Sequence, residues 1–164
     1  MHPARLPPDD LLRDCDETRT KRSGPGGQHR NKVETAVILR HQVSGVSAEA
    51  SERRSQADNR AVALFRLRLR LALVHREPPE PHPSPLWKSR RRDGRILVSV
   101  DHDDYPALVA EALDRIVAAE LDMPTAAAAL GVSPSQLVRL LEKEPAALVA
   151  LNRLRGAAGL KPLR

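Results

Sequence analysis

The chain has 164 residues and a formal net charge of +6, so it is long enough for one domain with a core or for two small domains. Residues 1–95 hold 20 Lys and Arg against 12 Asp and Glu, whereas residues 96–164 hold 7 against 9, which points to a polyanionic partner for the first part. One cysteine excludes an internal disulfide and a multi-cysteine metal cluster, 2% aromatic residues argue against a surface of stacked bases, and no apolar run is long enough to span a membrane.

The first predicted elements are strands on either side of a glycine-rich loop. "LLRDCD" (11–16) is predicted as a short strand, with Cys15 as a small half-buried residue rather than a nucleophile. "TAVILRH" (35–41) is rich in β-branched residues, "QVSG" (42–45) carries turn residues, and "VSAEA" (46–50) alternates apolar with polar. The three stretches after the loop therefore predict a β-hairpin.

A long amphipathic helix is predicted over 52–75. Within it "FRLRLRL" (65–71) alternates like a strand, but a longer apolar stripe at steps of three or four residues persists for about five turns and favours the helix. The stripe consists of Ala57, Ala61, Leu64, Leu67, Leu71 and Val74.

The proline-dense stretch "EPPEPHPSP" (77–85) suits neither a helix nor a central strand and predicts a boundary between domains. A basic tether, "WKSRRRDGR" (87–95), follows it, and then a short strand at "ILVSV" (96–100). The predicted organisation is an α+β domain at 1–76 with a short mixed sheet on the long helix, a proline-rich and basic linker at 77–95, and an all-α region at 96–164.

The all-α region contains "TAAAALGVSPSQLVRLL" (125–141), which is similar to a helix-turn-helix. Gly131 suits the turn, and Ser133 with Pro134 suits the start of the second helix. Its exposed front offers only Ser135, Gln136 and Arg139, so the pattern favours a helical bundle that uses the turn for packing over a DNA-binding module.

The glycine-rich loop, "KRSGPGGQHRNKVET" (21–35), combines three glycines and a glutamine with basic residues. Taken alone, it is compatible with a flexible surface loop or an anion-binding turn. Together with "ERRSQADNR" (52–60) at the opening of a helix, it resembles the GGQ domain of class I peptide chain release factors and of the smaller, codon-independent ribosome-rescue hydrolases. The resemblance runs over about residues 9–75 and preserves the order of the elements.

This resemblance implies hydrolysis of the ester between a nascent peptide and tRNA, in the peptidyl transferase centre of the large ribosomal subunit. Gly26, Gly27 and Gln28 are then the catalytic residues. A side-chain amide is no general base near neutrality, so Gln28 would orient a water and donate its backbone N–H to the oxyanion or the departing ribose oxygen. The expected partners are large-subunit rRNA and peptidyl-tRNA, with no cofactor and no metal, for a cytoplasmic monomer.

The same resemblance implies a set of RNA-contacting residues around the loop. Gln56 and Asn59 are expected to secure the loop and the turn from behind, and the three arginines of 53–60 could equally form a solvated helix face. The predicted RNA-contacting residues are Arg19, Lys21, Arg22, Ser23, Arg30, Asn31, Lys32, Arg53, Arg54 and Arg60.

Two departures from the family pattern shape the functional hypothesis. Only about eight residues precede the domain, which predicts a factor that does not read codons, and the last nine residues, "GAAGLKPLR", lack the Lys/Arg-rich tail of the rescue hydrolases. The basic segment 87–95 could substitute for the tail, and the C-terminal helices could dock on another rescue factor. Two alternatives stay open: a ribosome-binding factor without autonomous hydrolysis, and a helix-turn-helix regulator that binds DNA.

Overall fold

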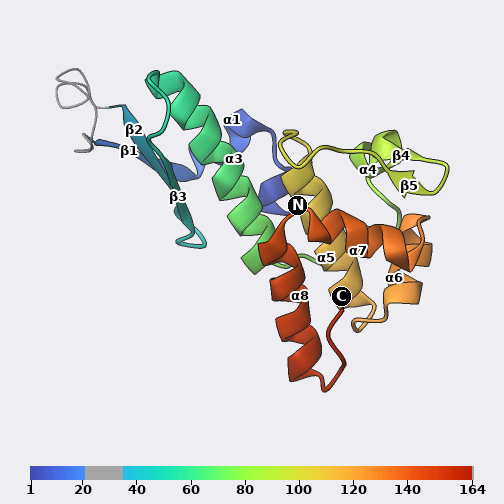
Figure 1. Ribbon diagram of the computed structural model, residues 1–164. Coiled ribbons are helices and arrows are strands. Elements are labelled where there is room, and N and C mark those ends of the chain that lie inside the picture. Colours follow the sequence, from blue (N-terminus) through green and yellow to red (C-terminus); the bar gives the residue numbers. More distant parts are fainter. Residues whose placement is uncertain (21–34, 164) are drawn as a thin grey trace. The chain divides into compact units, whose positions relative to one another are not determined.

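The computed structural model describes residues 1–20 and 35–163. The chain divides into two compact units, Pro3–Leu71 with Met1, and Ala72–Arg164 with His2. The expected α+β class is confirmed, since the first unit combines strands with helices (Figure 1). The division falls near the end of the long helix, before the proline-dense stretch. None of the helices in the described residues combines the length and apolar character that a membrane crossing needs.

The first unit contains a three-stranded sheet in the order β1-β2-β3, made of β1 (Cys15–Thr20), β2 (Ala36–His41) and β3 (Ser47–Ala50). Both strand pairs are antiparallel, so the expectation of a mixed sheet was wrong. The β2–β3 hairpin that the sequence predicted is confirmed. Gly45 in its turn has a φ of 69°, a conformation that glycine adopts without strain.

The segment before β1 differs from the prediction of a strand at 11–16. A 3₁₀ turn, η1 (Pro3–Arg5), is followed by the helix α1 (Pro8–Arg13), and β1 begins only at Cys15. Pro8 in the first helical turn has the φ that a helix needs. Two aspartates in that turn stabilise the helix, because their negative charges lie at the positive end of its dipole. Leu11 is the residue of this helix whose side chain is fully buried.

The long helix α3 (Gln56–Val74) confirms the prediction of a helix, but it starts later and buries a different face. Leu67 and Leu71 are fully buried as expected, whereas Ala57 and Ala61 are exposed and Val74 is 64% exposed. The buried stripe runs instead through Asn59, Ala63, Leu67 and Leu71 at a constant step of four residues. Within the first unit, one face of the sheet supplies the other half of this core, with Val37, Leu39, Ala48 and Ala50.

The second unit begins with the end of α3 and the proline-dense stretch, which has no helix or strand over 77–84. The part expected as a basic tether is folded: α4 (Pro85–Arg90) leads into a small antiparallel hairpin of β4 (Arg91–Arg92) and β5 (Arg95–Ile96). Trp87 causes this order, because its side chain is fully buried. Of the strand expected at 96–100, only Ile96 is in a strand, as the second residue of β5.

Four helices complete the second unit, α5 (Tyr105–Ala118), α6 (Met123–Leu130), α7 (Pro134–Glu142) and α8 (Pro145–Ala157), as the prediction of an all-α region required. The helix α7 contacts α5, α6, α8 and β5. The turn between α6 and α7 is as the sequence predicted: Gly131 adopts the left-handed conformation, and the Ser133 hydroxyl accepts a hydrogen bond from the backbone N–H of Gln136. Between 123 and 142 the chain holds one basic residue, Arg139.

Candidate functional site

The predicted catalytic and RNA-contacting residues fall into two groups. Nine of them lie in 21–34, outside the described residues: Lys21, Arg22, Ser23, Gly26, Gly27, Gln28, Arg30, Asn31 and Lys32. Four lie in the described part of the first unit: Arg19, Arg53, Arg54 and Arg60. The structure therefore shows the framework from which the glycine-rich segment leaves the sheet and to which it returns.

The sheet register brings the two ends of segment 21–34 together. Thr20, the last residue of β1, pairs with Ala36, the first residue of β2. Side chains two residues apart in a strand share a face, so Cys15, Glu17 and Arg19 lie on the same face as their partners His41, Leu39 and Val37. That is the buried face of the sheet, and its end at Arg19 is the end from which the segment leaves.

Asn59 fixes the end at which the segment returns. It is fully buried at the start of α3, and its side-chain nitrogen donates hydrogen bonds to the backbone oxygens of Thr35, at 2.7 Å, and of Arg53, at 2.9 Å. Its side-chain oxygen accepts a hydrogen bond from the backbone N–H of Arg53 at 2.9 Å. One amide thus joins Thr35, the first residue after the segment, to the turn before α3. The expected support of the loop itself by Gln56 and Asn59 concerns residues 21–34, which lie outside the described residues.

Glu17 fixes the other end. Its carboxylate accepts hydrogen bonds from Arg60 Nε at 2.7 Å and from Arg19 Nε at 3.0 Å. The Arg60 guanidinium, more than Arg19, holds the pKa of Glu17 below its usual range, although burial opposes the shift. Asn59 and Arg60 are neighbours in α3, so one turn of that helix holds the strand that leads into the segment and the residue that follows it.

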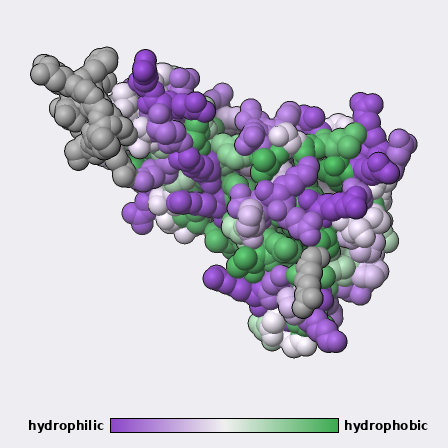
Figure 2. All heavy atoms as spheres, viewed as in Figure 1, coloured by the Kyte–Doolittle hydropathy of each residue, from purple (hydrophilic) through white to green (hydrophobic). Residues whose placement is uncertain are grey.

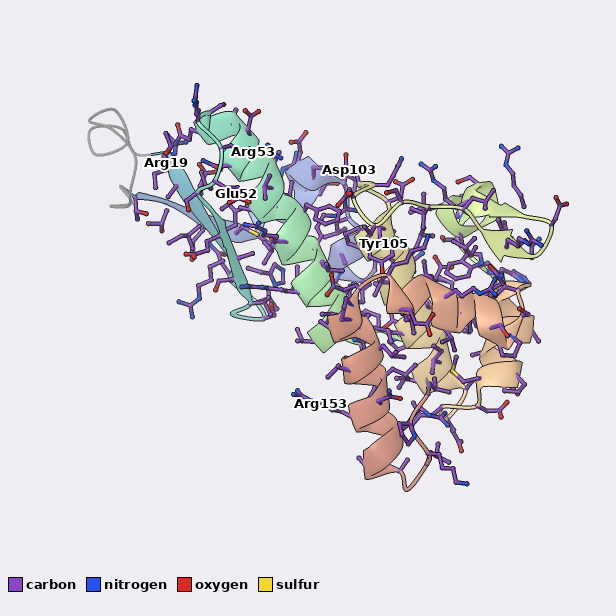
Figure 3. The ribbon with its side chains drawn as sticks, in the orientation of Figure 1. Arg19, Glu52, Arg53, Asp103, Tyr105 and Arg153 are labelled. Carbon is purple, nitrogen blue, oxygen red and sulfur yellow. The ribbon has the colours of Figure 1, made fainter. Side chains whose placement is uncertain are left out.

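The remaining two arginines are free to meet an anion. Arg53 and Arg54 lie in the turn before α3 with exposed side chains, and neither pairs with a carboxylate among residues 1–20 and 35–163. Figure 3 shows Arg19 and Arg53 at the end of the first unit where β1 ends. The four described arginines therefore differ: Arg53 and Arg54 are exposed and pair with no described carboxylate, whereas Arg19 and Arg60 share Glu17.

Sequence reasoning missed Glu17. A signal was available, because Glu17 is two residues from Cys15 and two from Arg19, which places a carboxylate on one face of a short strand with a cation beside it. The pairing with Arg60, 43 residues away, needed the position of α3.

Cys15 has the unreactive character that the sequence predicted. It begins β1, is half-buried, and its thiol donates a hydrogen bond to the backbone oxygen of Leu11. Burial, with smaller contributions from Asp14 and Asp16, raises its pKa to about 11, so the thiolate is scarce near neutral pH. Within the described residues, no three His, Cys, Asp or Glu side chains form a group that could hold a metal ion.

The framework around segment 21–34 can be compared with known proteins. Residues 11–95 match the RF-1 domain family, and the match covers the second half of α1, the three-stranded sheet, α3, α4, β4 and the first residue of β5. The chain belongs to the RF-1 domain family.

Several curated relatives are peptide chain release factors. The chain is 44% identical over 64 residues to the chloroplastic peptide chain release factor PrfB1 of Arabidopsis thaliana, which covers 39% of this chain and 14% of the relative. It is 33% identical over 109 residues to peptide chain release factor 1 of Ureaplasma parvum, covering 61% and 30%. It is 46% identical over 59 residues to the mitochondrial peptide chain release factor 1-like protein of Mus musculus, covering 35% and 16%. The chain thus spans less than a third of the length of each of these relatives.

Proposed function

We propose that this protein hydrolyses the peptidyl-tRNA ester in the peptidyl transferase centre of the large ribosomal subunit, without reading a codon. The observation that carries the proposal is the RF-1 domain match over residues 11–95, which encloses Gly26, Gly27 and Gln28. Large-subunit rRNA and peptidyl-tRNA are its partners, and the protein acts as a cytoplasmic monomer in termination or ribosome rescue.

The proposed chemistry depends on position rather than on proton transfer by the protein. Gln28 carries a neutral amide, which can orient one water toward the ester carbonyl but has no useful basicity. Its backbone N–H stabilises the negative charge that develops on oxygen, and the glycines before it leave room for the ester to approach. The RNA of the ribosome supplies the groups that move the proton.

The described framework supports this proposal because catalysis by positioning needs a rigid structural support for the catalytic residues. Thr20 and Ala36 are paired, Asn59 binds the backbone of Thr35, and Glu17 links β1 to Arg60. The exposed Arg53 and Arg54 add positive charge beside that structural support, where rRNA phosphates would lie.

The test is release of labelled peptide from ribosomes that carry peptidyl-tRNA with an empty decoding site. Gln28→Ala and Gly27→Ala should lower the rate at saturating protein by about 100-fold or more, since each removes positioning at the reacting atoms. Gln136→Ala, a glutamine change in α7 of the second unit, is the matched control and should release peptide like the wild type. Equal release by all four proteins would refute the proposal.

A second candidate is a ribosome-binding factor without autonomous hydrolysis, because the proposed chemistry leaves proton transfer to groups outside the protein. Peptide release and co-sedimentation, measured with one protein preparation on intact ribosomes and on free large subunits, distinguish the two candidate functions. Co-sedimentation without release on either particle would support the second candidate, and release by the isolated protein would exclude it.

A further inference from the structure

The second unit carries a cationic projection that the proposed hydrolysis does not use. It is a helix–hairpin of α4, β4 and β5 (Figure 1), in which the Ser84 hydroxyl caps α4 by accepting a hydrogen bond from the backbone N–H of Trp87. The turn between the strands is Asp93-Gly94, with φ values of 49° and 70°. Two successive residues at positive φ are typical of the two-residue loops that connect the strands of a β-hairpin.

The helix–hairpin is held rigidly within its unit. Trp87 is fully buried, and its indole N–H donates a hydrogen bond to the backbone oxygen of Leu130 at 2.9 Å. Ile96 is buried, and the backbone N–H of Leu97 bonds the oxygen of Arg90 at 2.9 Å. Cations on this projection are therefore presented by a fixed scaffold and lose little backbone freedom on binding a partner.

The basic side chains of 88–95 divide by what they contact. Arg90 Nε donates to Asp104 at 2.7 Å, and Arg91 donates to the backbone oxygen of Gly131 at 3.3 Å. Lys88, Arg92 and Arg95, which we term the hairpin cations, are exposed and pair with no carboxylate in the part of the chain that the structure describes. Figure 2 shows strongly hydrophilic side chains at this edge of the second unit.

Two of the hairpin cations lie directly opposite each other. In the β4–β5 register Arg92 pairs with Arg95 across the two strands. Like charges at opposed positions of an antiparallel pair destabilise it, whereas a glutamate at either position would stabilise it. A purely structural hairpin gains nothing from this arrangement, but an anion bound between the two guanidinium groups removes the repulsion.

The charge of the hairpin also contrasts with the rest of its unit. Residues 96–164 hold 7 basic and 9 acidic residues, so the concentration of positive charge in 88–95 is local. Arginine suits phosphate because its planar guanidinium donates two parallel hydrogen bonds to it. Leu97 is the one large apolar side chain exposed within 85–97, which is too little apolar surface to anchor the hairpin in a membrane.

We propose that Lys88, Arg92 and Arg95 form a second RNA-binding surface, which contacts phosphates of the RNA backbone independently of segment 21–34. The occupant is RNA on the ribosome, and the contact is electrostatic and insensitive to base sequence.

The test measures binding to a labelled single-stranded RNA, and to purified large ribosomal subunits, over a range of KCl concentrations. Arg92→Gln/Arg95→Gln should weaken binding and lower the slope of log K against log[salt] by about 1.4, or about 0.7 for each lost phosphate contact. Arg153→Gln/Lys161→Gln removes the same charge from exposed positions of the same unit and should leave the slope unchanged. Arg92→Lys/Arg95→Lys keeps the charge and should retain the slope, and Trp87 fluorescence reports that each variant is folded.

Three outcomes would overturn the inference: an unchanged slope for Arg92→Gln/Arg95→Gln, an equal loss in the control pair, or tighter hairpin-dependent binding to anionic vesicles than to RNA. The assay requires no hydrolysis. A Gln28→Ala protein that releases no peptide should show the same dependence on the hairpin, so failure here and failure of the proposed function are separable.

Discussion

Glu17 and Asn59 are two polar side chains on the buried side of the first unit, and the hydrogen bonds that each makes to other residues explain how both remain there. Burying a carboxylate or an amide is costly unless each is hydrogen-bonded. Arg60 and Arg19 satisfy Glu17, while Thr35 and Arg53 satisfy Asn59. The bonds that satisfy these groups also hold the two chain ends around segment 21–34.

The depressed pKa of Glu17 predicts a pH-dependent contribution to stability. Because the folded-state pKa lies below the ordinary value of about 4.3, this contribution is present above that value and is lost as the pH falls through the folded-state pKa. Glu17→Gln should therefore lower the free energy of unfolding by about 1 kcal/mol at pH 7, and the difference from wild type should shrink as the pH falls below about 4.

Urea unfolding at a series of pH values measures this difference. Asp9→Asn, a change at an exposed acidic residue of α1, is the control and should shift stability by less than about 0.5 kcal/mol at every pH. A Glu17→Gln deficit that stayed constant down to acid pH would mean that shape rather than charge is responsible.

The role of Asn59 was predictable from the sequence, and that of Glu17 was not. The family resemblance implied that Asn59, together with Gln56, secures the turn, and a short amide side chain can bond backbone groups close to it in the sequence. Glu17 has its main partner in another element, and no spacing in the sequence encodes that distance.

At the scale of elements, the long helix shows what periodicity can and cannot predict. The apolar steps predicted a helix and two of its core residues, Leu67 and Leu71. They did not predict the starting residue, because the side chain of Asn59 occupies the backbone N–H and C=O of Arg53 and keeps that residue in a turn. They also assigned Ala57 and Ala61 to the buried face, although both are exposed. Alanine is a weak indicator of burial, and the buried face includes the polar Asn59, which an apolar pattern does not select.

The hairpin at 91–96 was missed although it carries a turn signal. The dipeptide Asp93-Gly94 is among the strongest local indicators of a hairpin, but the basic residues on both sides were interpreted as a solvated tether. Burial of Trp87, whose indole N–H bonds the backbone oxygen of Leu130 in α6, holds this part in a fixed fold, and local sequence patterns do not encode that contact.

Gly131 connects the turn after α6 to this hairpin and predicts a measurable coupling. Its φ of 67° disfavours any side chain, and a Cβ there would lie 1.7 Å from Arg91 Nη1. Gly131→Ala should cost about 1–2 kcal/mol, chiefly from the left-handed backbone, because the end of the Arg91 side chain can move away. In an Arg91→Ala background the cost should be smaller by the part due to the clash.

A double-mutant cycle on the free energy of unfolding measures that part. Gly156→Ala in α8 is the control, since a Cβ there meets no atom within 4 Å and its φ is helical. Strict additivity of Gly131→Ala and Arg91→Ala would show that the two residues do not interact.

At the scale of the whole molecule, each of the two units has its own buried core. The first is built on the sheet and most of α3, and the second on α5–α8 with Trp87. The family match begins at residue 11 and ends at residue 95, so it covers most of the first unit and the helix–hairpin of the second, and the helices α5–α8 lie beyond the matched residues. Two separate cores could be anticipated from the proline-dense stretch, but the division falls at Leu71 and Ala72, within α3.

Separate cores predict that a defect in one unit leaves the other standing. Asn59→Ala removes three hydrogen bonds of the first unit and should cost about 2–3 kcal/mol. Trp87 is the only tryptophan of the chain and is buried in the second unit, so its fluorescence follows that unit. The urea midpoint from circular dichroism should fall in Asn59→Ala, while the midpoint from Trp87 fluorescence should stay in place.

Asp58→Ala, which changes the exposed neighbour, serves as the reference for this comparison and should move neither midpoint by much. If both midpoints of Asn59→Ala moved together, the two units would unfold as one cooperative block.

The raised pKa of Cys15 has a practical side. Maleimide dyes are attacked by thiolates, and the single native sulfhydryl of this chain stays almost wholly protonated at neutral pH. A cysteine introduced at an exposed position, such as Arg54 or Arg153, would therefore take up a fluorophore well before the native one. Dye pairs for distance measurements on ribosomal particles can be attached without first deleting a residue from the sheet.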